Sequence, residues 1–302
     1  MKKIWFYSLL VFLGGCCFGV LSTFVKLSYA NEFTLAQITG LQFLFGFLMI
    51  WSFIPFIRTV RQRRSMILKL IVSGIPMGLT GIFYYQSLQT IDASVAIILL
   101  FQFVWIGTLL EWTIDRKKPN QMRMIAIGTC MVGSFLAGGF FMSSFNITIE
   151  GVIWGLLAAV TFSTFIYLSG KVGKGVPAIQ KSAWLTTGGL LTVIILFSKT
   201  YLIEGFPLDT FLAVAPYGLI LGLFGVFLPP LLFSIGMPKV GSGLGTILSS
   251  SELPVAIMMS TFVLHETVTT SQWVGVVMII SGIIIGNGLN KKKTSHNMLK
   301  AS

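Results

Sequence analysis

Charged residues are scarce in this 302-residue chain, at 10% of the sequence against about 25% in soluble domains. That leaves too little polar surface for a water-soluble globule. Only two histidines and three cysteines occur, with no metal-ligand spacing around them. No phosphate-binding P-loop is present. The sequence therefore predicts no catalytic residues, no metal, no cofactor and no ATP-driven pump, and it disfavours a membrane-embedded enzyme, which needs a catalytic cluster at one membrane face.

Long apolar runs dominate instead, with 55% hydrophobic residues and a mean hydropathy of +0.88. Runs of about 20 apolar residues are long enough to cross a bilayer as helices. The first run continues past Cys16 to Val25, so we interpret it as a retained span and not as a cleaved signal peptide. We predict an all-α integral membrane protein with ten transmembrane helices at residues 5–25, 35–57, 67–88, 92–112, 122–142, 150–170, 180–199, 211–235, 241–264 and 272–289.

The basic residues alternate between the gaps that separate these runs. Nineteen of the 21 Lys and Arg residues lie in alternate gaps or in the tails, and only Lys26 and Lys199 lie in the other gaps. Cytoplasmic loops carry such an excess, so we predict a multi-pass protein of the cytoplasmic membrane with both termini inside. The net charge of +12 favours contacts with anionic lipid over nucleic-acid binding. We expect Glu111 and Asp115 to form local ion pairs with the basic residues 116–118.

The two halves of the chain repeat each other. Lys26 ends the first run as Lys171 ends the sixth, and SLQTIDAS at 87–94 precedes one run as GMPKVGSG at 236–243 precedes another. A unit of five crossings is odd, so the second copy enters the membrane from the opposite side. We predict two inverted five-helix repeats, 1–143 and 144–290, followed by a basic cytoplasmic tail, 291–302. Many secondary transporters have this construction, with the substrate site near the bilayer midplane.

Residues 241–286 resemble the EamA domain of the drug/metabolite transporter superfamily. The resemblance rests on Pro254 in mid-span, Glu266 twelve residues later, and Gly275 and Gly282 in the last run. The first half matches in layout over residues 93–133 but has Val104 and Arg116 where the family usually has proline and glutamate. The resemblance implies two five-helix domains, a central cavity among the first, third, fourth, sixth, eighth and ninth helices, and transport of small metabolites such as amino acids.

Glu252 is the sharpest candidate for a binding or coupling residue. An acidic group at the centre of a span costs at least ~2.5 kcal/mol to insert, so it persists where it faces a cavity or a partner. Pro254 lacks an N–H and deprives a carbonyl near Ser250 of its bond, and we expect Ser249, Ser250 and Ser251 to compensate. Two interpretations stay open: Glu252 recognises a substrate amine or a proton, or it is a buried carboxyl held by helix-packing hydrogen bonds.

Further candidates are polar or aromatic side chains within the runs. Each has an alternative role in helix packing, in the interfacial aromatic belt or as a static kink. The candidates for substrate binding are Gln102, Tyr84, Tyr85, Gln86, Trp105 and Trp154, and the candidates for gates or hinges are Pro229, Pro230 and Pro254.

The function predicted from these features is an alternating-access permease that exports amino acids or related compounds. A mixture of one acid, amides, serines and aromatics suits a small zwitterion better than an anion, which would require a central basic residue. The expected partners are a small-molecule substrate and the lipid bilayer, with protons as a candidate coupling ion and with a monomer or homodimer as the assembly. The alternatives are a flippase for lipid or polyprenyl-linked substrates and a drug efflux permease.

Overall fold

Helices form the described part of the chain in this computed structural model, which covers residues 2–91, 93–139, 148–203, 205–265 and 268–299 and contains no strand within those ranges. In lipid, each backbone polar group needs a partner within its own segment, which explains why the apolar runs are helical. The α-helices are α1 (Lys2–Gly19), α2 (Leu21–Ala30), α3 (Leu35–Ser52), α4 (Arg64–Thr90), α5 (Ala93–Phe101), α6 (Phe103–Asp115), α7 (Gln121–Ala137), α8 (Ile149–Lys171), α9 (Ala178–Leu196), α10 (Ser198–Ile203), α11 (Leu208–Leu221), α12 (Leu228–Val240), α13 (Ser242–Ser249), α14 (Glu252–Val263) and α15 (Thr270–Leu299).

The predicted all-α membrane architecture is confirmed. Among the described residues, nine helical segments are long and apolar enough to cross a membrane, and α7 is a shorter apolar helix at the position of the fifth predicted span. The expected boundary between residues 143 and 144 lies outside the described residues. Helix α15 runs on to Leu299, so the helix extends into the segment expected as a tail, and the division into domains stays a prediction.

Several spans are interrupted near their centres. The first span breaks at Val20 between α1 and α2, and the fourth breaks at Gln102 between α5 and α6. The ninth breaks at Ser250 and Ser251 between α13 and α14. The eighth contains the π-helical segment η2 (Gly222–Phe227) between α11 and α12. The fourth and ninth spans, which the predicted repeat would make equivalent, are therefore both broken.

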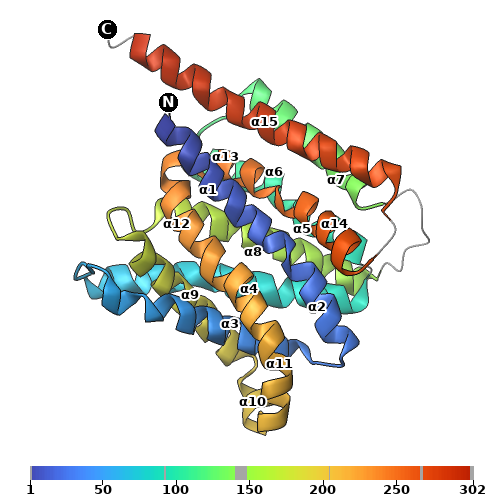
Figure 1. Cartoon of the computed structure of the whole chain (residues 1–302). Coiled ribbons are helices and arrows are strands. Elements are labelled where there is room, and N and C mark those ends of the chain that lie inside the picture. Colours follow the sequence, from blue (N-terminus) through green and yellow to red (C-terminus); the bar gives the residue numbers. More distant parts are fainter. Residues whose placement is uncertain (1, 92, 140–147, 204, 266–267, 300–302) are drawn as a thin grey trace.

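Helices α7 and α15 lie side by side along one edge of the bundle, as Figure 1 shows. Their contact is reciprocal: Gly133 of α7 approaches the Gly275 carbonyl, and Gly282 of α15 approaches the Ala126 carbonyl. Elsewhere α4 packs on α8 and α9, and α1 packs on α12. These glycines let the two helices approach closely.

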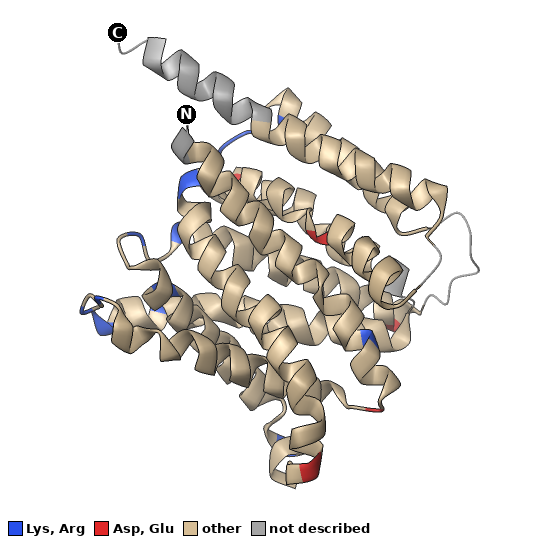
Figure 2. Ribbon diagram, viewed as in Figure 1, with Lys and Arg blue, Asp and Glu red and all other residues tan. Residues whose placement is uncertain are grey.

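Basic residues gather at the end of the bundle where the described chain begins, and few lie at the opposite end (Figure 2).

The expected partners of Glu111 and Asp115 were wrong. Arg123 Nη1 lies 2.8 Å from Glu111 Oε2, and Lys171 pairs with Asp115, which also accepts a 2.8 Å hydrogen bond from the Tyr167 hydroxyl. Arg116 adopts the left-handed region at φ 54° and ends α6. The acids on α6 are therefore paired by α7 and α8, because the bundle brings those helices to α6.

Candidate functional site

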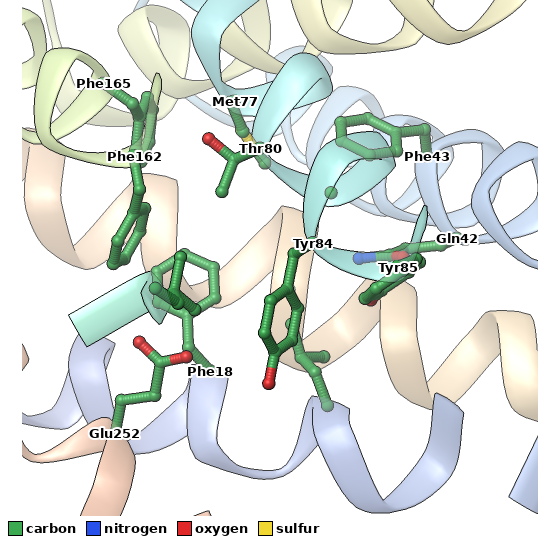
Figure 3. A pocket seen from close by; sticks show the side chains of 14 residues that line it. Phe18, Gln42, Phe43, Met77, Thr80, Tyr84, Tyr85, Phe162, Phe165 and Glu252 are labelled. Atoms are coloured by element: carbon green, nitrogen blue, oxygen red, sulfur yellow. The ribbon is translucent and has the colours of Figure 1, made fainter. Parts of the chain in front are cut away.

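A cavity lies among the helices of both halves, with about 510 Å³ of empty space among its lining atoms. Its walls combine aromatic and aliphatic side chains with a few polar groups (Figure 3). The described residues that line it are Phe18, Leu21, Gln42, Phe43, Met77, Thr80, Gly81, Tyr84, Tyr85, Leu100, Phe162, Phe165, Gly225 and Glu252. These residues come from the first, second, third, fourth, sixth, eighth and ninth of the predicted spans. Ligand pockets commonly have such a mainly apolar lining with a few polar groups.

Glu252 is the acidic residue of this lining. It is the first residue of α14, directly after the break, and its side chain is directed into the cavity beside Phe18 and Tyr84 (Figure 3). The residue is 8% exposed, and its Oε2 atom has no hydrogen-bond partner among the described residues. The N-terminal end of α14 carries a partial positive charge that favours a carboxylate, but it gives Oε2 no hydrogen-bond donor.

Helix α1 approaches this break closely because two of its residues lack side chains. A Cβ atom on Gly15 would lie 2.4 Å from Ser251 Oγ, and one on Gly19 would lie 2.4 Å from the Glu252 carbonyl oxygen. These approaches place α1 against the backbone that presents Glu252. The serine hydroxyl contributes as well, since Ser251 Oγ donates to the Phe12 carbonyl at 2.7 Å.

Tyr84 and Tyr85 of α4 were predicted as binding residues, and both line the cavity. Tyr85 is buried and donates a 2.9 Å hydrogen bond to Gln42 Oε1 of α3. The two tyrosine rings lie 6.1 Å apart between centroids. The cavity therefore brings together three of the predicted binding residues, namely Glu252, Tyr84 and Tyr85.

The three serines face away from the cavity. The hydroxyl groups of Ser249 and Ser250 donate to carbonyls one turn earlier, on Gly245 and Thr246. The Ser250 carbonyl, which Pro254 deprives of its usual donor, accepts instead from the Leu253 N–H at 3.3 Å. The serines thus serve the helix break and are not among the described lining residues.

Gln102, Gln86, Trp105 and Trp154 are also absent from the described lining. Gln102 Nε2 donates to the Ile98 carbonyl, and its Oε1 accepts a 2.8 Å hydrogen bond from Trp105 Nε1. Trp105 is 41% exposed, on the outside of the bundle. The ring of Trp154 lies 5.3 Å from that of Phe83 between centroids and is tilted by 32° to it, and Gln86 is partly buried.

The three prolines lie in buried helical positions. Pro229 and Pro230 open α12 directly after the π-helical segment η2, and Pro254 lies in the first turn of α14. A π-segment accommodates the carbonyls that two successive prolines leave without N–H donors. Whether these positions move during function stays a prediction.

Several lining residues were missed from the sequence. Gln42 is an amide inside an apolar run, in the same way as Gln102, so the signal that singled out Gln102 was present there too. Phe18, Phe43, Phe162 and Phe165 gave no such signal, because a phenylalanine within an apolar span has no contrast with its neighbours.

The profile of the EamA-like transporter family matches this chain twice, over residues 5–139 and 149–287. Among curated proteins, an uncharacterized transporter of Archaeoglobus fulgidus is 23% identical over 284 residues, which cover 91% of this chain and 94% of that protein. The uncharacterized transporter YwfM of Bacillus subtilis is 25% identical over 196 residues, 62% of each chain, so the match spans less than two thirds of YwfM. YvbV of Bacillus subtilis, also an uncharacterized transporter, is 26% identical over 260 residues, 82% of this chain and 80% of YvbV.

A crystal structure of another protein shares the fold. It superposes with a TM-score of 0.71 at 16% sequence identity and covers 92% of this chain and 98% of that one. At this identity the likeness concerns the arrangement of helices and carries nothing about a ligand.

Proposed function

Because this chain belongs to the EamA-like transporter family, we propose that it is a secondary transporter that moves small amine-bearing metabolites, amino acids and related compounds among them, by alternating access. The direction we propose is export across the cytoplasmic membrane. The observation that carries this proposal is the carboxyl group of Glu252, which enters a mainly apolar cavity with one oxygen unpartnered among the described residues.

A carboxylate in such surroundings requires a cation. Burying an isolated charge is costly, and a buried carboxyl group either acquires a positive partner or takes up a proton. A substrate ammonium and a proton would compete for the same oxygen. Competition of this kind couples substrate release to proton uptake without any further site.

The interrupted spans support alternating access. Discontinuous helices near the membrane centre are typical of secondary transporters, where their ends line the substrate site. Here one interruption, between α13 and α14, immediately precedes Glu252. The basic end of the bundle (Figure 2) supports cytoplasmic termini by the positive-inside rule.

The test is counterflow of labelled amines and amino acids in proteoliposomes, measured from pH 5 to pH 9 for Glu252→Gln beside the unaltered protein. Glutamine keeps the size of the side chain but cannot ionise. A hydrogen bond to a charged group is worth about 1.5–3 kcal/mol, so we expect the variant to bind substrate roughly tenfold to a hundredfold more weakly. We also expect its residual transport to lose its dependence on pH.

The matched control is Glu32→Gln, which makes the same chemical change at an exposed residue between α2 and α3. It should behave as the unaltered protein does. Titratable side chains on helices near Glu252 remain in both variants, among them Cys16 and Cys17 of α1, Lys26 and Tyr29 of α2, Tyr84 and Tyr85 of α4, and Cys130 of α7. Transport that keeps its rate and its pH profile in Glu252→Gln would refute the role of this carboxyl group.

A further inference from the structure

The charged groups that line the cavity suit only one of the two charges of a zwitterion. Of the described residues that line it, Glu252 is acidic and none is basic. The ammonium group of an amino acid would find its partner in Glu252. Its carboxylate would have to be buried in the same cavity without a cation, beside a second negative charge.

Neutral donors offer little compensation for such a carboxylate. Tyr85 already donates to Gln42 Oε1 at 2.9 Å. Thr80 Oγ1 donates to the Pro76 carbonyl at 2.7 Å and lies 3.0 Å from Thr161 Oγ1. The remaining donors on the wall are the Tyr84 hydroxyl and the Gln42 amide. Two neutral donors do not offset the burial of a carboxylate, because isolated buried anions are much costlier than buried neutral groups.

The aromatic and aliphatic residues of the cavity suit both the cation and the hydrocarbon group of an amine. Phe18 and Tyr84 lie beside the Glu252 carboxyl group (Figure 3), where their ring faces attract a cation. Phe18 packs edge-to-face on Phe162, with centroids 5.1 Å apart, so the neighbouring wall is apolar. Phe43, Phe165 and Leu100 extend this apolar surface.

We infer that the cavity selects amines that carry an apolar or aromatic group and no acidic group, and that it discriminates against the corresponding amino acids. This inference rests on the proposed function and narrows its substrate class. Glu252 supplies the charge, the rings of Phe18 and Tyr84 supply a second attraction for the cation, and the apolar wall accepts the hydrocarbon part.

Three compounds with one shared skeleton test this selectivity: 2-phenylethylamine, L-phenylalanine and 3-phenylpropionate. The second adds a carboxylate to the first, and the third replaces the amine by a carboxylate. Binding to the purified full-length protein is measured by titration, and uptake is measured in proteoliposomes. We expect 2-phenylethylamine to bind roughly tenfold or more tightly than phenylalanine, as an unpaired buried charge in the latter would require. We expect no binding of phenylpropionate.

Variants locate the selectivity in this cavity. Glu252→Gln should weaken binding of the amine roughly tenfold to a hundredfold, and Glu32→Gln should not alter it. Tyr84→Phe retains the ring and should retain most of the affinity, whereas Tyr84→Leu should weaken amine binding several-fold, as the loss of a cation–π contact does.

The outcomes separate the inference from the proposed function. If phenylalanine binds as tightly as the amine or more tightly, and its transport depends on Glu252, the substrate class inferred here is wrong and the transporter proposal stands. If none of the three compounds binds, the inference is wrong. If the amine binds and is transported equally well in Glu252→Gln, both the inference and the proposed role of Glu252 are wrong.

Discussion

The substitution Gly243→Ala, in α13, tests the ion pair that Glu111 of α6 forms with Arg123 of α7. Gly243 lies in the first turn of α13. A Cβ atom there would lie 2.0 Å from Arg123 Nη2 and 2.1 Å from Glu111 Oε2. Neither distance is compatible with van der Waals contact. Both atoms are the ends of flexible side chains, so the expected response is separation of the ion pair and not a shift of the backbone.

The cost follows from the surroundings of the pair. Its side chains are 19% and 9% exposed, so solvent screens it only in part. Loss of a hydrogen bond between charged groups costs about 1.5–3 kcal/mol, and alanine in place of glycine within a helix returns about 1 kcal/mol. We therefore expect Gly243→Ala to lower the free energy of unfolding by about 0.5–2 kcal/mol, measured as a lower midpoint of thermal denaturation in detergent.

Two comparisons isolate the ion pair as the cause. Gly128→Ala, in α7, adds a Cβ atom with no heavy atom within 4 Å, so its midpoint should be unchanged or higher. In an Arg123→Gln background the pair is already broken, so Gly243→Ala should there no longer lower the midpoint and should raise it by the gain of alanine over glycine in a helix, about 1 kcal/mol. An equal loss of stability in both backgrounds would refute the reasoning, as would a midpoint for Gly243→Ala that equals that of Gly128→Ala.

Two further predictions concern packing and orientation. Gly74→Ala would place a Cβ atom 1.9 Å from the Leu185 carbonyl oxygen; because backbone cannot move aside as a side chain can, we expect a loss of about 1–3 kcal/mol or more, seen as a lower yield of monodisperse protein and a midpoint below that of Gly243→Ala. With the three native cysteines replaced by serine, a cysteine at Asp209 should react with an impermeant maleimide on intact cells, and one at Arg61 only after permeabilisation; the reverse pattern would invert the proposed orientation.

The spans were predictable because hydropathy is a local property of the chain. Each apolar run needs its backbone bonds satisfied within itself, whatever its neighbours are. Glu252 was predictable for a related reason, since an ionisable residue within such a run is costly and stands out from its surroundings. Neither argument requires knowledge of how the helices pack.

The direction of the neighbouring side chains was not predictable in the same way. Successive residues of a helix point about 100° apart, so Ser251 turns toward the Phe12 carbonyl of α1 while Glu252 turns into the cavity. Trp105 was likewise expected at the site but lies on the outer surface. Polarity within a span indicates that a side chain has a partner, and only the packing of helices shows whether that partner is a cavity or a carbonyl.

Lys181 shows a further limit of the charge pattern. As one of the inner basic residues it contributed to the predicted topology, and such residues usually lie in water or among lipid headgroups. In the structure it is 1% exposed and its Nζ donates to the Ser169 carbonyl in the last turn of α8. The final carbonyls of a helix lack intrahelical donors and carry partial negative charge. Lys181, in the first turn of α9, therefore caps α8, and that role depends on how α9 turns back against α8 and not on the charge pattern itself.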